Sequence, residues 1–236
     1  MITLPPLTEG RLIARRNRFV AEVDVAGTAD TAHVPNSGRM LELFVPGARV
    51  LLRPAPPDSG RRTAYDLLLI EYQGRWVGVD SRMPPHLVVD AWRAGLLDAF
   101  SAYESVRREV RYGESRLDLL FDGPPGLLYV EAKSVNLVED GTAWFPDAPT
   151  TRGARHLREL QAAVREGCRA AVVFVIQRDD VERLVPYEDA DPAFAEALRV
   201  AIAHGVEAYA IACAVGPEGS SPVGLVPVVA ERKVPA

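Results

Sequence analysis

A pair of prolines, Pro84 and Pro85, divides the chain into two stretches with different hydrophobic patterns. Before the pair, short apolar runs are separated by turn residues, which is typical of a small β-barrel or β-sandwich. These runs are GRLIARR from Gly10, RFVAEVDV from Arg18, TAHV from Thr31, GARVLLR from Gly47, TAYDLLLIEYQG from Thr63 and RWVGVD from Arg75. Because proline fits the first turn of a helix and the following pattern is helical, we predict two domains, residues 1–84 and 85–236.

The second stretch alternates between helical and strand patterns. Apolar spacing predicts a helix over about residues 86–100, and the runs SVRREVRY, SRLDLLF and GLLYVEAKSV, joined by short turns, predict an antiparallel meander. The segment TTRGARHLRELQAAVREG predicts a helix capped by Thr150 or Thr151 and ended by Gly167, and the buried strand AAVVFVIQ follows it. The tail predicts one more helix and two strands. The expected fold class is therefore α/β, with a mixed sheet between layers of helices.

Length and composition indicate ordinary globular domains. The chain has 236 residues, of which 48% are hydrophobic, so it can bury a full core. It has no apolar run long enough to cross a membrane, and its first residues lack the features of a secretory signal. We therefore expect a cytoplasmic protein without a membrane partner. Cys168 and Cys213 lie in apolar surroundings and are predicted to be buried thiols rather than a disulfide or a zinc site.

Basic residues gather in clusters, although the net charge of the chain is −5. Residues 1–84 hold 11 arginines, no lysine and 9 acidic residues, so this part is net positive and the remainder net negative. Arginine beside aromatic residues such as Phe19 and Tyr112 suits nucleic-acid binding, whereas the alternative for each cluster is an ordinary solvated face. The clusters are Arg11, Arg15, Arg16 and Arg18; Arg61 and Arg62; Arg107, Arg108 and Arg111; and Arg152, Arg155, His156 and Arg158.

Two acids and a lysine interrupt apolar strands in the meander. In LYVEAKSV, Glu131 and Lys133 share one face because side chains alternate along a strand. Asp118 lies in the preceding strand, and neighbouring strands are about 4.8 Å apart, so both carboxylates can converge on Mg²⁺ or Mn²⁺. Lys133, about 6.6 Å along the strand, can then orient an attacking water or stabilise charge on a phosphate. The alternative is an ion-pair ladder on a solvent-facing sheet surface.

The helix that follows the meander begins with basic residues, among them Arg152 and His156. A helix N-terminus beside a metal site attracts phosphate, so these residues are candidates for contact with a phosphate group, with capping and packing as the alternative for His156. Asp90 and Glu109 are candidates for a third acid at the metal site. For each of them the alternative is a structural salt bridge.

The segment HVPNSGRM offers side-chain donors and backbone N–H groups on or beside a turn. These groups can bind a nucleotide, while the competing interpretation is an Asn-Ser-Gly turn that serves only the barrel. The residues that we predict to contact nucleic acid are Arg16, Arg18, His33, Asn36, Arg39, Arg107, Arg108, Arg152 and His156.

Four stretches together resemble a known family: HVPNSGRM from His33, RREVRYGESRLDLL from Arg107, YVEAKSV from Tyr129 and FPDAPTTRGARHLREL from Phe145. The D…ExK pattern and the order of elements resemble the PD-(D/E)XK nuclease-like fold. The four stretches resemble, more specifically, the sugar fermentation stimulation protein (SfsA) family. The resemblance implies an OB-fold-like barrel, a nuclease-like C-terminal domain that binds Mg²⁺ through Asp118 and Glu131, DNA binding and a link to sugar use. Ser134 departs from the family pattern, in which asparagine follows the lysine.

Two functions follow from the pattern and the resemblance. The first is a DNA-binding protein with a Mg²⁺-dependent phosphodiesterase site at Asp118, Glu131 and Lys133. The second is a DNA-binding regulator of sugar-metabolism genes that uses the nuclease-like scaffold without catalysis. A third, an enzyme acting on sugar phosphates, has no sugar-binding signature to support it. The residues do not specify single- or double-stranded DNA, and a homodimer is an open expectation.

Overall fold

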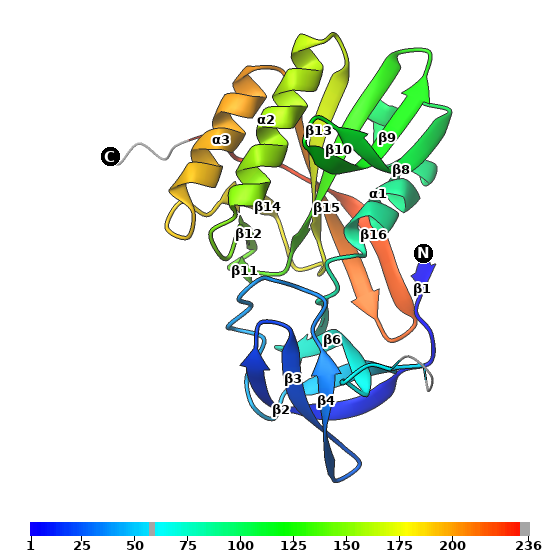
Figure 1. The fold of residues 1–236 in the computed structure, drawn as a ribbon, viewed down its shortest axis with the longest axis vertical. Helices are drawn as coiled ribbons and strands as arrows, with labels where there is room; N and C mark the ends of the chain where they lie inside the picture. Colours follow the sequence, from blue (N-terminus) through cyan, green and yellow to red (C-terminus); the bar gives the residue numbers. More distant parts are fainter. Residues whose placement is uncertain (57–59, 232–236) are drawn as a thin grey trace.

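The structure is a computed structural model that describes residues 1–56 and 60–231. A β-barrel packs below a larger sheet that carries helices on its faces (Figure 1). This architecture confirms the predicted fold class, an OB-like barrel followed by a helix-flanked mixed sheet. No helix within these ranges is both long and apolar enough to cross a membrane.

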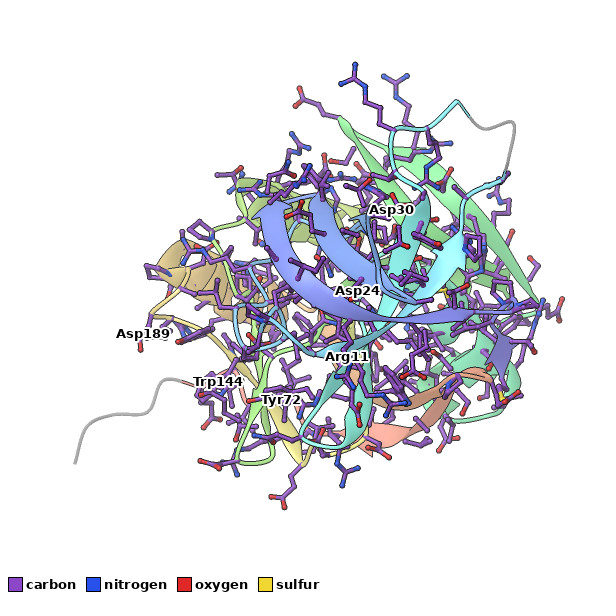
Figure 2. The ribbon with its side chains drawn as sticks, turned by 90° about the horizontal axis from the view of Figure 1, so that it is seen from below. Arg11, Asp24, Asp30, Tyr72, Trp144 and Asp189 are labelled. Atoms are coloured by element: carbon purple, nitrogen blue, oxygen red, sulfur yellow. The ribbon has the colours of Figure 1, made fainter. Side chains whose placement is uncertain are left out.

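The barrel is built from the short runs that precede the double proline. Its strands lie in the order β4-β3-β2-β5-β6-β7, and a parallel pairing of β4 with β6, at Ala32 and Tyr65, closes five of them into a barrel. The closure excludes the alternative of a sandwich. Figure 2 views the barrel from below and labels Arg11, Asp24 and Asp30 on its strands. The strands are β2 (Thr8–Asn17), β3 (Val20–Val25), β4 (Thr28–His33), β5 (Arg49–Pro54), β6 (Tyr65–Tyr72) and β7 (Arg75–Gly78).

The larger sheet has seven strands in the order β1-β16-β15-β13-β10-β9-β8. The pairs β10–β13 and β13–β15 are parallel and the other pairs are antiparallel, so the sheet is mixed, and β8, β9 and β10 form the predicted meander. The strands are β1 (Ile2–Thr3), β8 (Ser105–Tyr112), β9 (Ser115–Gly123), β10 (Gly126–Val135), β13 (Arg169–Ile176), β15 (Glu207–Gly216) and β16 (Gly219–Val226).

Helices cover both faces of this sheet. α1 (Pro84–Arg93) packs on a core that includes Phe121 and Val130, while α2 (Thr151–Arg165) and α3 (Pro192–Ala203) pack on the opposite core around Phe174. The cap of α2 follows the prediction, because the Thr150 hydroxyl accepts a hydrogen bond from the Gly153 N–H at 3.0 Å. This cap fixes where α2 begins beside β10.

Two details of the second domain differ from the predictions. The first helix ends at Arg93 rather than near Phe100, because Gly95 adopts a φ of 73° that stops the helix, and only a 3-10 turn, Asp98–Phe100, follows. A small sheet was not predicted; it consists of β11 (Val138–Glu139), β12 (Thr142–Phe145) and β14 (Arg183–Pro186). Its strands are too short to show a clear alternation in the sequence.

The chain passes from one domain to the other at two places, and the double proline is only one of them. β1 pairs with β16, so the first residues belong to the larger sheet, and the barrel lies between them and α1. Hydrogen bonds join the two domains: the Gly78 N–H donates to the Gln177 carbonyl, and the Gln177 amide donates to the Asp80 carbonyl, both at 3.1 Å. The barrel is therefore inserted into the fold of the larger domain and is fastened to it.

Candidate functional site

Asp118 and Glu131 come together where the β9–β10 ladder ends. Regular pairing runs as far as Val130 opposite Leu119, and one residue further the Asp118 carboxylate accepts a hydrogen bond from the Ala132 N–H at 2.8 Å. The Asp118 side chain thus takes the place of a backbone carbonyl beside β10. The predicted meeting of the two acids across adjoining strands is present in the structure.

Glu131 is the centre of a buried polar cluster. Its residue is 4% exposed, and its Oε1 accepts hydrogen bonds from the Lys133 ammonium, at 2.6 Å, and from His156 Nδ1. Its other oxygen, Oε2, is buried and has no hydrogen-bond partner among the described residues. Leaving a buried carboxylate oxygen unpaired is costly, so this atom is suited to a ligand that the protein itself does not supply.

His156 belongs to this cluster and not to the protein surface. It is 1% exposed, on the side of α2 that packs against the sheet. The Arg152 guanidinium donates to His156 Nε2 at 3.3 Å, so Nδ1 carries the hydrogen that Glu131 accepts. Of the two interpretations of His156, phosphate contact or capping and packing, its burial favours packing: the ring holds the Glu131 carboxylate from within.

The two acids have opposite electrostatic surroundings. Burial, followed by the charge of Glu131, raises the pKa of Asp118 to about 6. Burial also favours the neutral form of Glu131, but Lys133 and His156 outweigh it, so the pKa of Glu131 lies below its usual range. An ionised Glu131 thus stands beside an Asp118 that lacks a sufficient positive neighbour.

The donor set fits a hard divalent cation. An unpaired, ionised Glu131 oxygen and a destabilised Asp118 carboxylate are oxygen ligands of the kind that Mg²⁺ and Mn²⁺ bind, usually with several waters. No cluster of three or more histidine, cysteine, aspartate or glutamate side chains arranged for a metal occurs within residues 1–56 and 60–231. The site therefore offers two carboxylates, with waters or substrate oxygens to complete the shell.

Neither candidate for the third acid has the partners of this cluster. Asp90, on α1, forms a salt bridge of 2.8 Å with the N-terminal amino group. Glu109, on β8, is exposed and pairs with Arg116 at 2.9 Å. The structure thus supports the structural alternative for both residues.

The predicted nucleic-acid contacts separate into exposed and buried groups. Asn36 is 8% exposed, and its amide donates to the Val79 carbonyl at 3.0 Å while its oxygen accepts from the Gly38 N–H at 2.8 Å. Its side chain therefore holds the turn together, which supports the structural interpretation. The arginines among the predicted contacts are all exposed, and one of them, Arg16, pairs with Glu22. They are Arg16, Arg18, Arg39, Arg107, Arg108 and Arg152.

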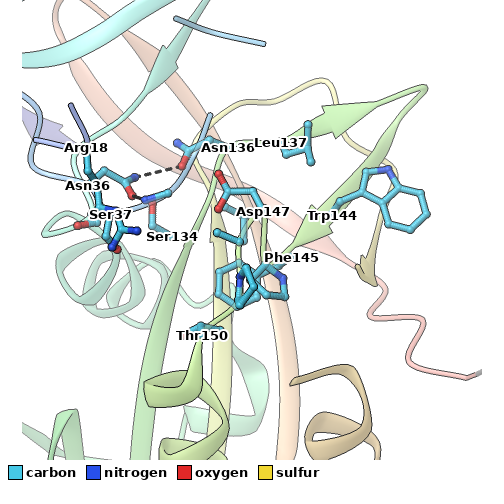
Figure 3. Close-up of a pocket in the computed structure, with 16 residues that line it drawn as sticks. Arg18, Asn36, Ser37, Ser134, Asn136, Leu137, Trp144, Phe145, Asp147 and Thr150 are labelled. Carbon is cyan, nitrogen blue, oxygen red and sulfur yellow. Dashed lines mark hydrogen bonds between the residues drawn. The ribbon is translucent and has the colours of Figure 1, made fainter. Parts of the chain in front are cut away.

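A pocket of about 210 Å³ lies between the barrel and the larger domain (Figure 3). Asn36 on the barrel side donates to Asn136 across it at 3.4 Å, and Asp147 accepts a hydrogen bond from the Met40 N–H at 2.9 Å. Sequence reasoning missed the role of Asp147, although the residue lies in one of the motifs that carry the resemblance. Its carboxylate ties the barrel turn to the segment that leads into α2.

Fold and site together define a two-domain protein, an OB-like barrel joined to a helix-flanked mixed α/β domain that contains a buried acidic pair. Two family models match the chain: the SfsA N-terminal OB domain over residues 13–79, and the sugar fermentation stimulation protein RE domain over residues 82–219. The chain belongs to the sugar fermentation stimulation protein family.

Relatives with this name cover nearly the whole chain. The homologue from Desulforamulus reducens is 48% identical over 212 residues, which is 90% of this chain and 88% of the relative. The homologue from Moorella thermoacetica is 46% identical over 221 residues, 92% of this chain and 94% of the relative. The solved structure of Pyrococcus furiosus SfsA in complex with Ca²⁺ is 33% identical, with a TM-score of 0.88 over 97% of this chain and 99% of that one.

Proposed function

We propose that this protein binds DNA and hydrolyses phosphodiester bonds with the help of Mg²⁺ or Mn²⁺ at Asp118 and Glu131. The observation that carries the proposal is the buried Glu131 oxygen without a hydrogen-bond partner, next to a second carboxylate whose pKa is raised to about 6. A divalent cation bound between them would relieve both costs. The solved relative from Pyrococcus furiosus, which is in complex with Ca²⁺, supports a cation site in this family.

The residues around the pair have separate roles in this proposal. When bound, the cation supplies a Lewis acid and lowers the pKa of a water ligand. His156 holds the Glu131 carboxylate in place through its Nδ1 hydrogen bond. Lys133, whose side chain is 11% exposed, is the cationic group nearest to this carboxylate, and it orients the attacking water or stabilises charge on the phosphate.

The second candidate is DNA binding without hydrolysis, as in a regulator of sugar-metabolism genes. The observation that favours it is that Glu131 already has two partners, Lys133 and His156, and that no third acidic ligand joins the pair among the described residues. In this case the Lys133–Glu131 ion pair stabilises the sheet, and DNA binds on the surface arginines. We place either function in the cytoplasm, with DNA as the partner.

Cleavage assays separate the two candidates. Supercoiled plasmid and labelled oligonucleotides, single-stranded and duplex, are incubated with Mg²⁺ or Mn²⁺ and with wild type, Asp118→Ala or Lys133→Met. We expect each substitution to lower the cleavage rate by about 100-fold or more, because each removes a group that acts on the developing charge. Glu109→Ala, an exposed acid in the same meander, is the matched control and keeps the wild-type rate.

Two results contradict the catalytic proposal. Equal rates in all four proteins would assign the cleavage to a contaminant. Binding of DNA without any product, in either metal, would leave the non-catalytic function. The same oligonucleotides show which form of DNA the protein prefers.

A further inference from the structure

Arginines converge on one open cleft of the barrel, a cleft that neither the acidic pair nor its proposed chemistry uses. This arginine cleft has a volume of about 360 Å³ and is open to solvent. Its lining residues come from β4, from the segment before β6, from β6 itself and from the segment before α1. They are His33, Arg61, Arg62, Thr63, Asp66 and Arg82.

Asp66 is the buried centre of the cleft. The residue is 1% exposed, and its carboxylate accepts hydrogen bonds from Arg53 and Arg61, while Arg82 lies 4.0 Å away. Burial alone would raise the pKa of Asp66, but the hydrogen bonds from Arg61 and Arg53 outweigh it and lower the pKa to about 2. Asp66 is therefore ionised at neutral pH and holds the guanidinium groups in fixed positions.

Positive charge exceeds negative charge around this carboxylate. Arg82 also forms a salt bridge of 2.6 Å with Asp80, so among residues 1–56 and 60–231 two acids face four arginines, Arg53, Arg61, Arg62 and Arg82. Within the described part of the chain, Arg62 forms no salt bridge, and its side chain is exposed. Fixed guanidinium groups with spare N–H donors are suited to phosphate oxygens, because less side-chain freedom is lost on binding.

The basic surface continues from the arginine cleft along α1 to β8. His86, in the first turn of α1, follows Arg82 by four residues, and its ring contacts the Arg108 guanidinium at 2.9 Å. Burial, and next the charge of Arg108, lowers the pKa of His86, so its ring nitrogen is available to accept from that arginine. Arg108 stands on β8 directly opposite Leu119, which belongs to the core that α1 covers. Its side chain therefore lies on the α1 face of the sheet, whereas Glu131 meets His156 on the α2 face.

We propose that the arginine cleft, together with Arg108, binds phosphate groups of the nucleic-acid backbone along the α1 side of the molecule. The inference rests on the proposed DNA binding and adds a site to it. The cleft is open and leads on to further basic residues, which suits a chain of phosphates; a free phosphate would be better held in an enclosed pocket. The barrel thus contributes a specific anchoring site as well as general positive charge.

The test measures DNA binding by fluorescence anisotropy across a salt series, with a labelled oligonucleotide and the full-length protein. Arg62→Ala should weaken binding by about 3- to 10-fold and reduce the slope of log affinity against log salt by about one, because one phosphate contact is lost. Arg11→Ala is the matched control. Arg11 is also an exposed barrel arginine, but it lies at the opposite end of β5, where its guanidinium donates to the Gly47 carbonyl at 3.1 Å.

The outcomes distinguish this site from the proposed function. If wild type binds DNA and Arg62→Ala binds it as well as Arg11→Ala does, the arginine cleft is not an anchor, while the proposed function stands. If wild type binds no DNA, both proposals fail. If inorganic phosphate displaces the oligonucleotide where sodium chloride of equal ionic strength does not, the cleft is a site for free phosphate and the backbone assignment is overturned.

Discussion

The two domains bury carboxylates in opposite ways. In the barrel, Asp66 is surrounded by arginines that lower its pKa to about 2. In the larger sheet, Asp118 has a pKa raised to about 6, and an oxygen of Glu131 has no hydrogen-bond partner among the described residues. The two buried sites therefore differ in their cationic neighbours. Asp66 in the barrel has more of them than it neutralises, and the acidic pair in the larger sheet has too few.

This difference is the physical basis of the two proposals, a cation at one region and an anion at the other. A buried acid that fixes more arginines than it neutralises leaves a positive surface, and such a surface binds anions. A pair of acids with too few positive partners gains stability from a bound cation. A phosphodiester with a divalent metal supplies both charges. Each of the following experiments breaks or sharpens this comparison.

The largest expected effect is on metal affinity. Glu131→Gln keeps an oxygen for Lys133 and His156 but removes the negative charge, so we expect affinity for Mn²⁺, measured by titration calorimetry, to fall about 100-fold. Asp66→Asn and Glu109→Gln, which change acids elsewhere, should leave the Mn²⁺ affinity unchanged. Loss of Mn²⁺ binding in Asp66→Asn but not in Glu131→Gln would reverse the assignment of the two regions.

The second effect is on stability through Asp66. Asp66→Asn removes the charge that fixes the arginines, and we expect a loss of about 1–2 kcal/mol at pH 7 in urea unfolding, allowing for screening by solvent. Because the pKa of Asp66 is lower in the folded state than in the unfolded state, its contribution is full above about pH 4 and disappears as pH falls through about 2. If Asp66→Asn lost the same free energy of unfolding at pH 7 and pH 2, the shape of the Asp66 side chain and not its charge would be responsible.

Asp118 should show the opposite sign. Its pKa is raised in the folded state, so the folded protein is more stable when Asp118 is protonated. The free energy of unfolding therefore falls as pH rises from about 4 through about 6. In the presence of a chelator, Asp118→Asn should therefore be more stable than wild type by about 1 kcal/mol at pH 7.5, with no gain at pH 4. A variant that is less stable than wild type at pH 7.5 would contradict the raised pKa.

The smallest expected effect concerns the geometry around Asp66. Arg53 contacts this carboxylate through both Nε and a terminal nitrogen, which lysine cannot reproduce. We expect Arg53→Lys to lower the free energy of unfolding by about 0.5 kcal/mol, measured by the same urea titration. Arg11→Lys is the control without a carboxylate partner. An equal change in the free energy of unfolding of both variants would show that the two-point contact of Arg53 does not contribute to stability.

Local patterns in the sequence predict much of this arrangement. Alternation along the strands places Glu131 and Lys133 together, and the Thr150 cap and Gly167 correctly bound α2. These features depend on residues that are close in the chain, and their physical rules are local. The meeting of Asp118 with Glu131 was also predictable, because only a short turn separates their strands.

Contacts between distant segments were not predictable in this way. The sequence shows Asp66 as a single charge in an apolar run, and Arg53, Arg61 and Arg82 as members of different segments. Only the closed barrel and its junction with α1 bring these arginines to one carboxylate. Likewise, nothing near His156 in the sequence shows that its ring turns inward to Glu131, because that depends on how α2 packs on β10.

The pairing of β1 with β16 has a mechanical consequence. The barrel is joined to the larger domain by two covalent connections, one after β1 and one before α1, so it cannot swivel freely as a domain on a single tether can. The spacing between the arginine cleft and the acidic pair is consequently a fixed length. If both proposals hold, this length sets how far any cut lies from the phosphate anchored in the arginine cleft.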